Sequence, residues 1–188
     1  SADGTANDAT LDLTSMGAAT LNLTKGNATE VLTLGTVNKN TTTIDASAYD
    51  GLVSVTGSAS ATTLDLKFGA AGNTITMGAA NDTVSIADLN ADDIDGAGGT
   101  DTLTATINDA AVTEASTNFE TITYNIANNT QTTITGANGK GIDTAKTFTL
   151  TGGDALTTYA HDLVSPAVLT SYDMSGYTGK STALTVAA

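Results

Sequence analysis

The sequence predicts an all-β fold and, within that class, a parallel β-solenoid or β-roll with two short strands in each coil of about 20 residues. Three observations predict it. Thr, Val, Ile and Leu recur in short runs, while the helix formers Glu, Gln and Lys are scarce. Gly, Asn or Ala bounds each run, and each run is too short to form a stable strand by itself. In the middle of the chain the runs also recur at a nearly constant spacing.

The short runs share one pattern. An aliphatic residue is expected to point into a narrow core, and the flanking Thr, Ser, Asp or Asn residues are expected to point outward. Because two runs complete one coil, alternate runs should stack on the same side of the solenoid. In chain order the runs are residues 10–13, 20–23, 31–34, 43–45, 52–55, 63–66, 74–77, 83–86, 93–95, 102–104, 121–123, 133–135 and 147–149.

Two ladders of inward-pointing residues are expected from this stacking. The first consists of Leu64, Val84, Leu103, Ile122 and Ile142. The second consists of Ile75, Ile94, Val112 and Ile134. An antiparallel sandwich with strands at a similar spacing is the alternative fold. It is disfavoured by an aromatic content of 4%, which is low for a thick sandwich core.

Composition and charge exclude several classes of function. The formal net charge is −14, and all six basic residues are Lys, so nucleic acid is not expected as a partner. The absence of Cys excludes a disulfide scaffold and Cys-based zinc or redox sites. With His161 as the single histidine, a catalytic triad is not expected either, and we expect no enzyme activity. No apolar run approaches the roughly 20 residues that a transmembrane helix needs.

The strongest motif is the nonapeptide at residues 96–104, GAGGTDTLT. Its glycines allow a turn whose carbonyls point toward one spot, Asp101 at position six supplies charge there, and Leu103 at position eight enters the core. Residues 77–85 form a related unit around Asp82. Calcium takes six to eight oxygen ligands and accepts carboxylates mixed with backbone carbonyls. The pattern therefore predicts calcium-binding coils.

The residues at position six of four successive units are Asn73, Asp82, Asp92 and Asp101. Alternate turns of a two-sided coil fall on the same side, so we expect Asp82 to stack with Asp101 and Asn73 with Asp92. Without a cation, such stacked carboxylates would repel each other. An ordinary acidic turn, with Asp as a local cap, is the alternative. The full set of expected metal-site residues is Asp82, Asp101, Asp92, Asn73, Gly78, Ala80, Gly96, Gly98 and Gly99.

These two units resemble the nonapeptides of the repeats-in-toxin family. Residues 118–122, NFETI, resemble a segment that follows such repeats in bacterial surface-layer proteins, and residues 43–49 are similar to another recurrent segment of those proteins. The resemblance covers roughly residues 40 to 125. It implies a calcium-dependent β-solenoid that is exported by type I secretion and crystallises on the cell surface.

We therefore expect a non-enzymatic structural protein of a bacterial surface layer, which binds Ca²⁺ and self-associates into a lattice or fibre. Residues 1–150 should form the solenoid, with calcium coils around 69–107, and residues 151–188 should form a less regular terminal or capping part. The chain is expected to be part of a longer protein, in which regions outside it bind surface polysaccharide.

Two other roles remain open. The stronger is a module of a large secreted adhesin of the same repeat type, since it can share every feature above. Ice binding is the weaker role, because outward threonines could tile a flat face while Ser85, Asp93 and Asp95 break the array. The threonines concerned are the pairs Thr102 and Thr104, Thr121 and Thr123, and Thr133 and Thr135.

Overall fold

The computed structural model describes most of the chain. The described residues are 9–15, 19–25, 31–38, 40–56, 65–68, 73–87, 89, 92–108, 111–114, 116–127, 131–136, 145–153, 158–164, 169–179 and 182–187. These residues form strands and turns and contain no helix. In this part of the chain there is accordingly no helix of the length and apolarity that crossing a membrane requires.

The strands form three parallel sheets. The eight-stranded sheet contains β2 (Thr20–Lys25), β4 (Thr43–Tyr49), β6 (Asp65–Phe68), β8 (Thr83–Ile86), β10 (Thr102–Ile107), β13 (Thr121–Ile126), β15 (Thr147–Gly152) and β17 (Ser171–Tyr177). The six-stranded sheet contains β1 (Ala9–Leu11), β3 (Val31–Thr36), β5 (Leu52–Thr56), β7 (Thr74–Thr76), β9 (Asp93–Asp95) and β12 (Ser116–Thr117). The four-stranded sheet contains β11 (Ala111–Glu114), β14 (Gln131–Gly136), β16 (Thr158–Val164) and β18 (Thr182–Ala187).

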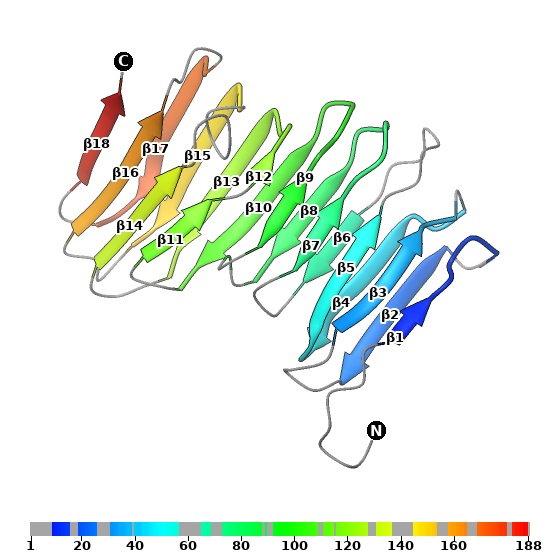
Figure 1. The fold of residues 1–188 in the computed structure, drawn as a ribbon. Coiled ribbons are helices and arrows are strands. Elements are labelled where there is room, and N and C mark those ends of the chain that lie inside the picture. The colour runs from blue at the N-terminus through cyan, green and yellow to red at the C-terminus, as the bar shows by residue number, and fades with distance from the viewer. Residues whose placement is uncertain are drawn as a thin grey trace.

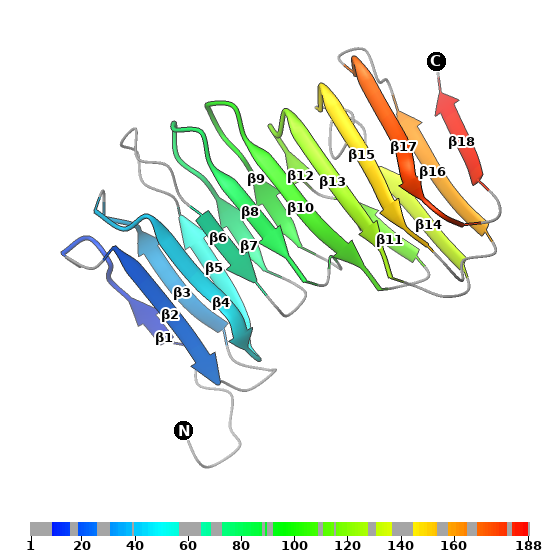
Figure 2. The same cartoon turned by 180° about the vertical axis from the view of Figure 1, so that it is seen from behind.

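The chain winds as a solenoid with coils of roughly 22 residues, which confirms the predicted fold class. Strands alternate between the eight-stranded sheet and the sheets on the opposite side, except that β11 and β12 both lie on the opposite side. Strands β1 and β18 lie at opposite ends of the stack (Figure 1). The reverse view shows the eight-stranded sheet running the whole length of the molecule in sequence order (Figure 2). Eight strands at about 4.8 Å spacing extend over about 34 Å.

The first predicted ladder is correct in its centre and wrong at both ends. Val84, Leu103 and Ile122 stack in register, as the 19-residue spacing predicts. Below Val84 lies Leu66, whereas Leu64 is outside the described residues. Above Ile122 lies Phe148, whereas Ile142 is also outside them. The constant spacing fails because the coils differ in length: the step from Leu66 to Val84 is shorter than the central steps, and the step from Ile122 to Phe148 is longer. The register is set by the residue that fills the core.

The second ladder is wrong at one step. Ile75 pairs with Ile94 as predicted, but the next residue in register is Ser116 rather than Val112. Val112 instead pairs with Ile134 in the four-stranded sheet. The coil after β10 carries two short strands, β11 and β12, so the second side of the solenoid passes from one sheet to another at this coil. Spacing alone gives no sign of that change.

The core is a column of aliphatic and aromatic side chains between the sheets. Alternation buries every second residue in the central strands of the eight-stranded sheet, as in β10, where Leu103, Ala105 and Ile107 are buried between more exposed threonines. Toward the C-terminal end the column becomes aromatic. Phe148 packs edge-on against Tyr124, with ring centroids 5.3 Å apart, and lies 4.9 Å from the ring of Tyr172. Burial of these faces supplies most of the driving force for stacking.

Strands continue beyond residue 150, the boundary predicted for the solenoid. That boundary falls inside β15, and β16, β17 and β18 extend the sheets in parallel. The pairing of β15 with β17 shifts register between Thr149 and Thr151. In β17 the carboxylate of Asp173 accepts a hydrogen bond from the backbone N–H of Ser175 at 2.8 Å. This bonding over two residues, which lowers the pKa of Asp173, is typical of a local kink.

Candidate metal centre

Acidic side chains form a ladder at the turns that lead into the eight-stranded sheet. Asp82, Asp101 and Glu120 each stand immediately before a strand, namely β8, β10 and β13. Asp82 and Asp101 are 2% and 1% exposed, although carboxylates rarely lie so deep without partners. Each acid is held at this depth because the residue two positions later, Val84 or Leu103, is buried in the core.

Two carboxylates of this ladder, those of Asp101 and Glu120, accept a hydrogen bond from the coil before them. The backbone N–H of Asp82 donates to Oδ1 of Asp101 at 2.8 Å, and the N–H of Asp101 donates to Oε2 of Glu120 at 2.8 Å. The predicted stacking of Asp82 with Asp101 is therefore present as a hydrogen bond between coils. Glu120 is not among the metal-site residues expected from the sequence, and its 19-residue spacing from Asp101 is the signal that finds it.

A second ladder lies at the turns leading into the six-stranded sheet. Asn73 precedes β7 and Asp92 precedes β9, and both side chains are buried. Oδ1 of Asp92 accepts hydrogen bonds from the backbone N–H of Asn73 at 2.7 Å and from its Nδ2 at 2.9 Å. Oδ1 of Asn73 accepts in turn from the N–H of Val53 at 3.0 Å. The pairing of Asn73 with Asp92 thus links successive coils, and its side chains already have donors from the protein.

The carboxylate of Asp101 is the electrostatic centre of the first ladder. Its Oδ2 atom is buried and has no hydrogen-bond partner. Desolvation raises the pKa of Asp101 to about 6, the N–H of Asp82 opposes that rise, and the carboxylates of Asp82, Glu120 and Asp95 add to it. A buried, unpaired carboxylate oxygen is costly. A proton or a bound cation would offset this cost.

The glycine turn before Asp101 is tightly stacked on its neighbours. The N–H of Gly96 donates to the carbonyl of Thr117 at 2.9 Å, and the N–H of Gly98 donates to the carbonyl of Gly78 at 3.2 Å. Gly99 has φ of 132°, a conformation open to glycine and strained for other residues. A side chain at Gly99 would collide with the backbone of Ala80 in the turn below. Gly98 and Gly99 therefore lie against Gly78 and Ala80 of the coil before, and Gly96 lies against the coil that follows.

Alanine occupies two positions in these glycine-rich turns, Ala80 and Ala97, and the structural consequences differ. Ala80 is buried with φ outside the left-handed region, so alanine is compatible with that position. Ala97 has φ of 61°, where a glycine would be unstrained. Its N–H donates to Oδ1 of Asp95 at 2.9 Å, and the same oxygen accepts from Nδ2 of Asn118 at 2.7 Å. Asp95 thus fixes this turn, a role that the nonapeptide pattern does not indicate.

The carboxylate of Asp101 has an acceptor open to a cation, whereas the acceptors described in the second ladder are already occupied. Oδ2 of Asp101 is an unused acceptor beside Gly96, whereas Oδ1 of Asp92 accepts two hydrogen bonds from Asn73. Within the described residues, no group of three or more His, Asp or Glu side chains could hold a metal ion. A cation at Asp101 would therefore need backbone carbonyls for most of its ligands, as the glycine turn was predicted to provide.

The raised pKa of Asp101 predicts a pH-dependent stability. A carboxyl whose pKa is higher in the folded state contributes stability below its unfolded value, and loses that contribution as the pH rises through about 6. In a chelator, Asp101→Asn should therefore melt at a higher temperature than the wild type at pH 7, and the difference should shrink toward pH 5. Melting curves across this range test it. A difference that stays constant with pH would contradict the assignment.

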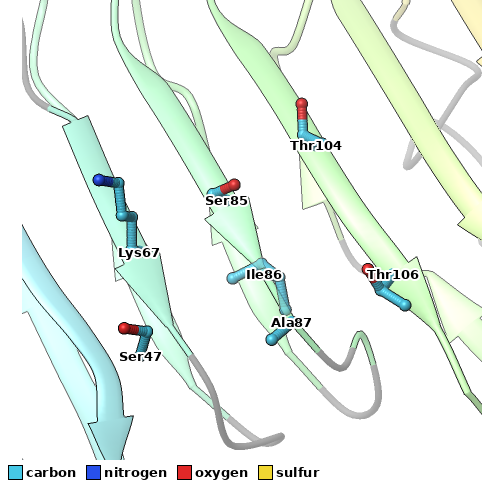
Figure 3. Close-up of a pocket in the computed structure, with 7 residues that line it drawn as sticks. All are labelled: Ser47, Lys67, Ser85, Ile86, Ala87, Thr104 and Thr106. Atoms are coloured by element: carbon cyan, nitrogen blue, oxygen red, sulfur yellow. The ribbon is translucent and has the colours of Figure 1, made fainter.

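A shallow groove also lies on the outer side of the eight-stranded sheet (Figure 3). Lys67 and Ser47 line one side of it, and Thr104 and Thr106 line the other. The remaining lining residues are Ser85 and Ile86 of β8 and the following Ala87, and the small side chains of Ser85 and Ala87 leave room for the hollow. The groove has hydroxyl groups and one ammonium but no carboxylate or imidazole, and it offers no acid–base pair.

Comparison with protein-family models gave no match, and neither did comparison with curated proteins or with solved structures.

Proposed function

We propose that this chain is a structural protein of a bacterial surface layer, a β-solenoid that calcium stabilises and that assembles with copies of itself on the cell surface. It would be exported by type I secretion and anchored to surface polysaccharide by regions outside this sequence. The observation that carries the proposal is the carboxylate of Asp101. It is buried, stacked against other acids, and has one oxygen without a partner.

The residues that would hold calcium are Asp101, through Oδ2, and its stacked neighbour Asp82, with backbone oxygens of the turn at 96–99. The second ladder, Asn73 and Asp92, would be a weaker site. A bound Ca²⁺ would supply the positive charge that the buried acids need. Because the carboxylate of Asp101 also accepts a hydrogen bond from the backbone N–H of Asp82, holding it in place also holds two coils together. Binding free energy would thus become folding free energy.

The net charge of −14 connects the calcium site with assembly. Two such chains repel each other at low ionic strength, and the repulsion falls as carboxylates are neutralised. The stacked parallel sheets supply a straight, regular body that can repeat in an array. A module of a secreted adhesin would use the same solenoid but would act as a monomer that contacts a cell or glycan.

The first test is calcium-dependent stability. Millimolar calcium should raise the melting temperature relative to chelator, by the equivalent of about 2.7 kcal/mol when calcium is at 100 times its Kd. Asp101→Asn should lose most of this gain, because the buried acceptor has no charge left. Asp93→Asn, which removes an equally negative but exposed carboxylate, is the matched control and should keep it. If calcium leaves the wild-type melting curve unchanged, the metal-dependent fold is wrong.

The second readout is electron microscopy of the calcium-loaded protein. Ordered two-dimensional sheets support the surface-layer role. If calcium stabilises the protein but the protein remains monomeric and binds cells or glycans, the adhesin alternative replaces the surface-layer role.

A further inference from the structure

One region of the eight-stranded sheet is free of charge on its outer side. Strands β8, β10, β13 and β15 contain no Asp, Glu, Lys or Arg, although the chain has 20 acidic and six basic residues. Their outward positions carry threonine, with one serine and one asparagine. We call the outer side of these four strands the threonine face; Figure 2 views it from the front.

Charged residues stand at both limits of the threonine face. One row of outward residues crosses it through Ser85, Thr104, Thr123 and Thr149, which pair in register from strand to strand. The same row continues to Lys67 beyond β8. At the other limit it reaches Asp173 on β17, next to the register shift. The uncharged region is therefore a bounded patch rather than a general property of the surface.

The set of threonines in this array differs in part from the set expected from the sequence. Thr133 lies on β14 in the four-stranded sheet, on the other side of the solenoid. Thr147 and Thr149 take its place beside Thr121 and Thr123. Asp93, which was expected to interrupt the array, also lies on the opposite side, in β9. The face is consequently more continuous than the sequence predicts.

The threonine face is rigid and repetitive. Strand spacing of about 4.8 Å and a distance of about 6.8 Å between alternate residues give a two-dimensional pattern of hydroxyl and methyl groups. Each β-branched side chain has few rotamers to lose on contact. The register is unbroken from β8 to β15. Such a face can meet a flat, uncharged partner at small entropic cost.

We propose that the threonine face binds the same face of a second copy of the chain. The argument is electrostatic. Two chains of net charge −14 repel wherever acidic surfaces meet, and this patch lets them touch with none of its own charges opposed. A basic partner would find no carboxylate on this face with which to form an ion pair. The inference rests on the proposed assembly function, for which it supplies the contact surface.

The size of the face sets the strength of the contact. The eleven outward positions, each about 4.8 Å by 6.8 Å, cover about 360 Å² per copy, less than half of the roughly 800 Å² that each partner contributes to a stable complex. A single pair of molecules should therefore associate weakly. The contact gains strength when many copies are held in an array, because each further contact is then intramolecular. The groove beside Lys67 limits the flat area at one edge.

Sedimentation equilibrium in chelator tests the contact apart from calcium. Association of the wild type should strengthen from low salt to 1 M NaCl, where the Debye length falls to about 3 Å and repulsion is screened. Thr104→Lys with Thr149→Lys places two charges on the face, two strand spacings apart, and should weaken the association constant at least tenfold. The melting temperature of each variant confirms that it is folded.

The matched control is Thr76→Lys with Thr117→Lys. These threonines lie on the six-stranded sheet, and both pair with the intervening Asp95, so the charge change and the spacing are the same. The control should associate as the wild type does. Equal weakening in both variants, or no association of the wild type at high salt, would overturn the inference while leaving the calcium test unaffected. Thermal hysteresis that only Thr104→Lys with Thr149→Lys abolishes, without self-association, would show that ice occupies the face instead.

Discussion

Phe148→Ala should lower the free energy of unfolding by about 3–5 kcal/mol, the range for removing a fully buried aromatic ring. The ring is 0% exposed and continues the ladder of Ile122 into the last coils. It also contacts two other rings, Tyr124 at 5.3 Å and Tyr172 at 4.9 Å between centroids. Its loss removes apolar burial and both aromatic contacts. Narrow coils cannot close around the resulting cavity, since backbone hydrogen bonds fix their spacing.

Urea unfolding, followed by circular dichroism, measures this change. Thr147→Ala is the control, because Thr147 precedes Phe148 in the same strand and points outward. It should cost less than about 1 kcal/mol, as expected for a surface position in a strand. Comparable losses from both substitutions would mean that β15 is held by its backbone rather than by the aromatic column.

Gly96→Ala is expected to destabilise the fold by several kcal/mol and to abolish calcium-dependent stabilisation. A Cβ at Gly96 would overlap the backbone carbonyl of Asn118 in the next coil and come within 3.0 Å of Oδ2 of Asp101. The carbonyl cannot move aside like a flexible side chain. Overpacking of this kind costs about 1–3 kcal/mol, and displacing the turn would add the loss of its hydrogen bond to Thr117.

Gly98→Ala is the matched control two residues away in the same turn. A Cβ there would meet nothing nearer than the Cα of Ala79 at 3.9 Å, an ordinary contact. It should therefore leave the melting temperature within a few degrees of the wild type. If both alanine variants are equally stable in chelator and in calcium, the close stacking of the turn at Gly96 on the coil of Asn118 is wrong.

Much of the fold could be predicted from the sequence because the solenoid repeats one physical unit. The 19-residue step from Val84 to Leu103 to Ile122 is visible in the sequence, and each step sets one rung of the core. The same step places Asp101 on Asp82 and Asp92 on Asn73. Where a coil is longer, as between Ile122 and Phe148, the sequence period no longer predicts which residues pair, because core packing sets the register.

The role of the acidic residues was harder to predict. The nonapeptide pattern indicates oxygen ligands, but it does not show that Asp92 shares its Oδ1 between two donors of Asn73. It also gives no reason to single out Asp95, which accepts from Ala97 and Asn118. Both bonds depend on which polar groups the neighbouring coil presents. A linear pattern describes one coil, whereas these bonds join two.

The change from the six-stranded to the four-stranded sheet has a consequence for how the molecule would come apart. The eight-stranded sheet is continuous, while the opposite side of the solenoid consists of the six-stranded and the four-stranded sheets. These two sheets meet in the coil that carries β11 and β12. Solenoids are stabilised mainly by contacts between neighbouring coils, so cooperativity passes from coil to coil. Among the described strands, only the eight-stranded sheet is hydrogen-bonded without interruption through this coil. Local unfolding should therefore divide the molecule at this coil into two cooperative units, which the eight-stranded sheet still connects.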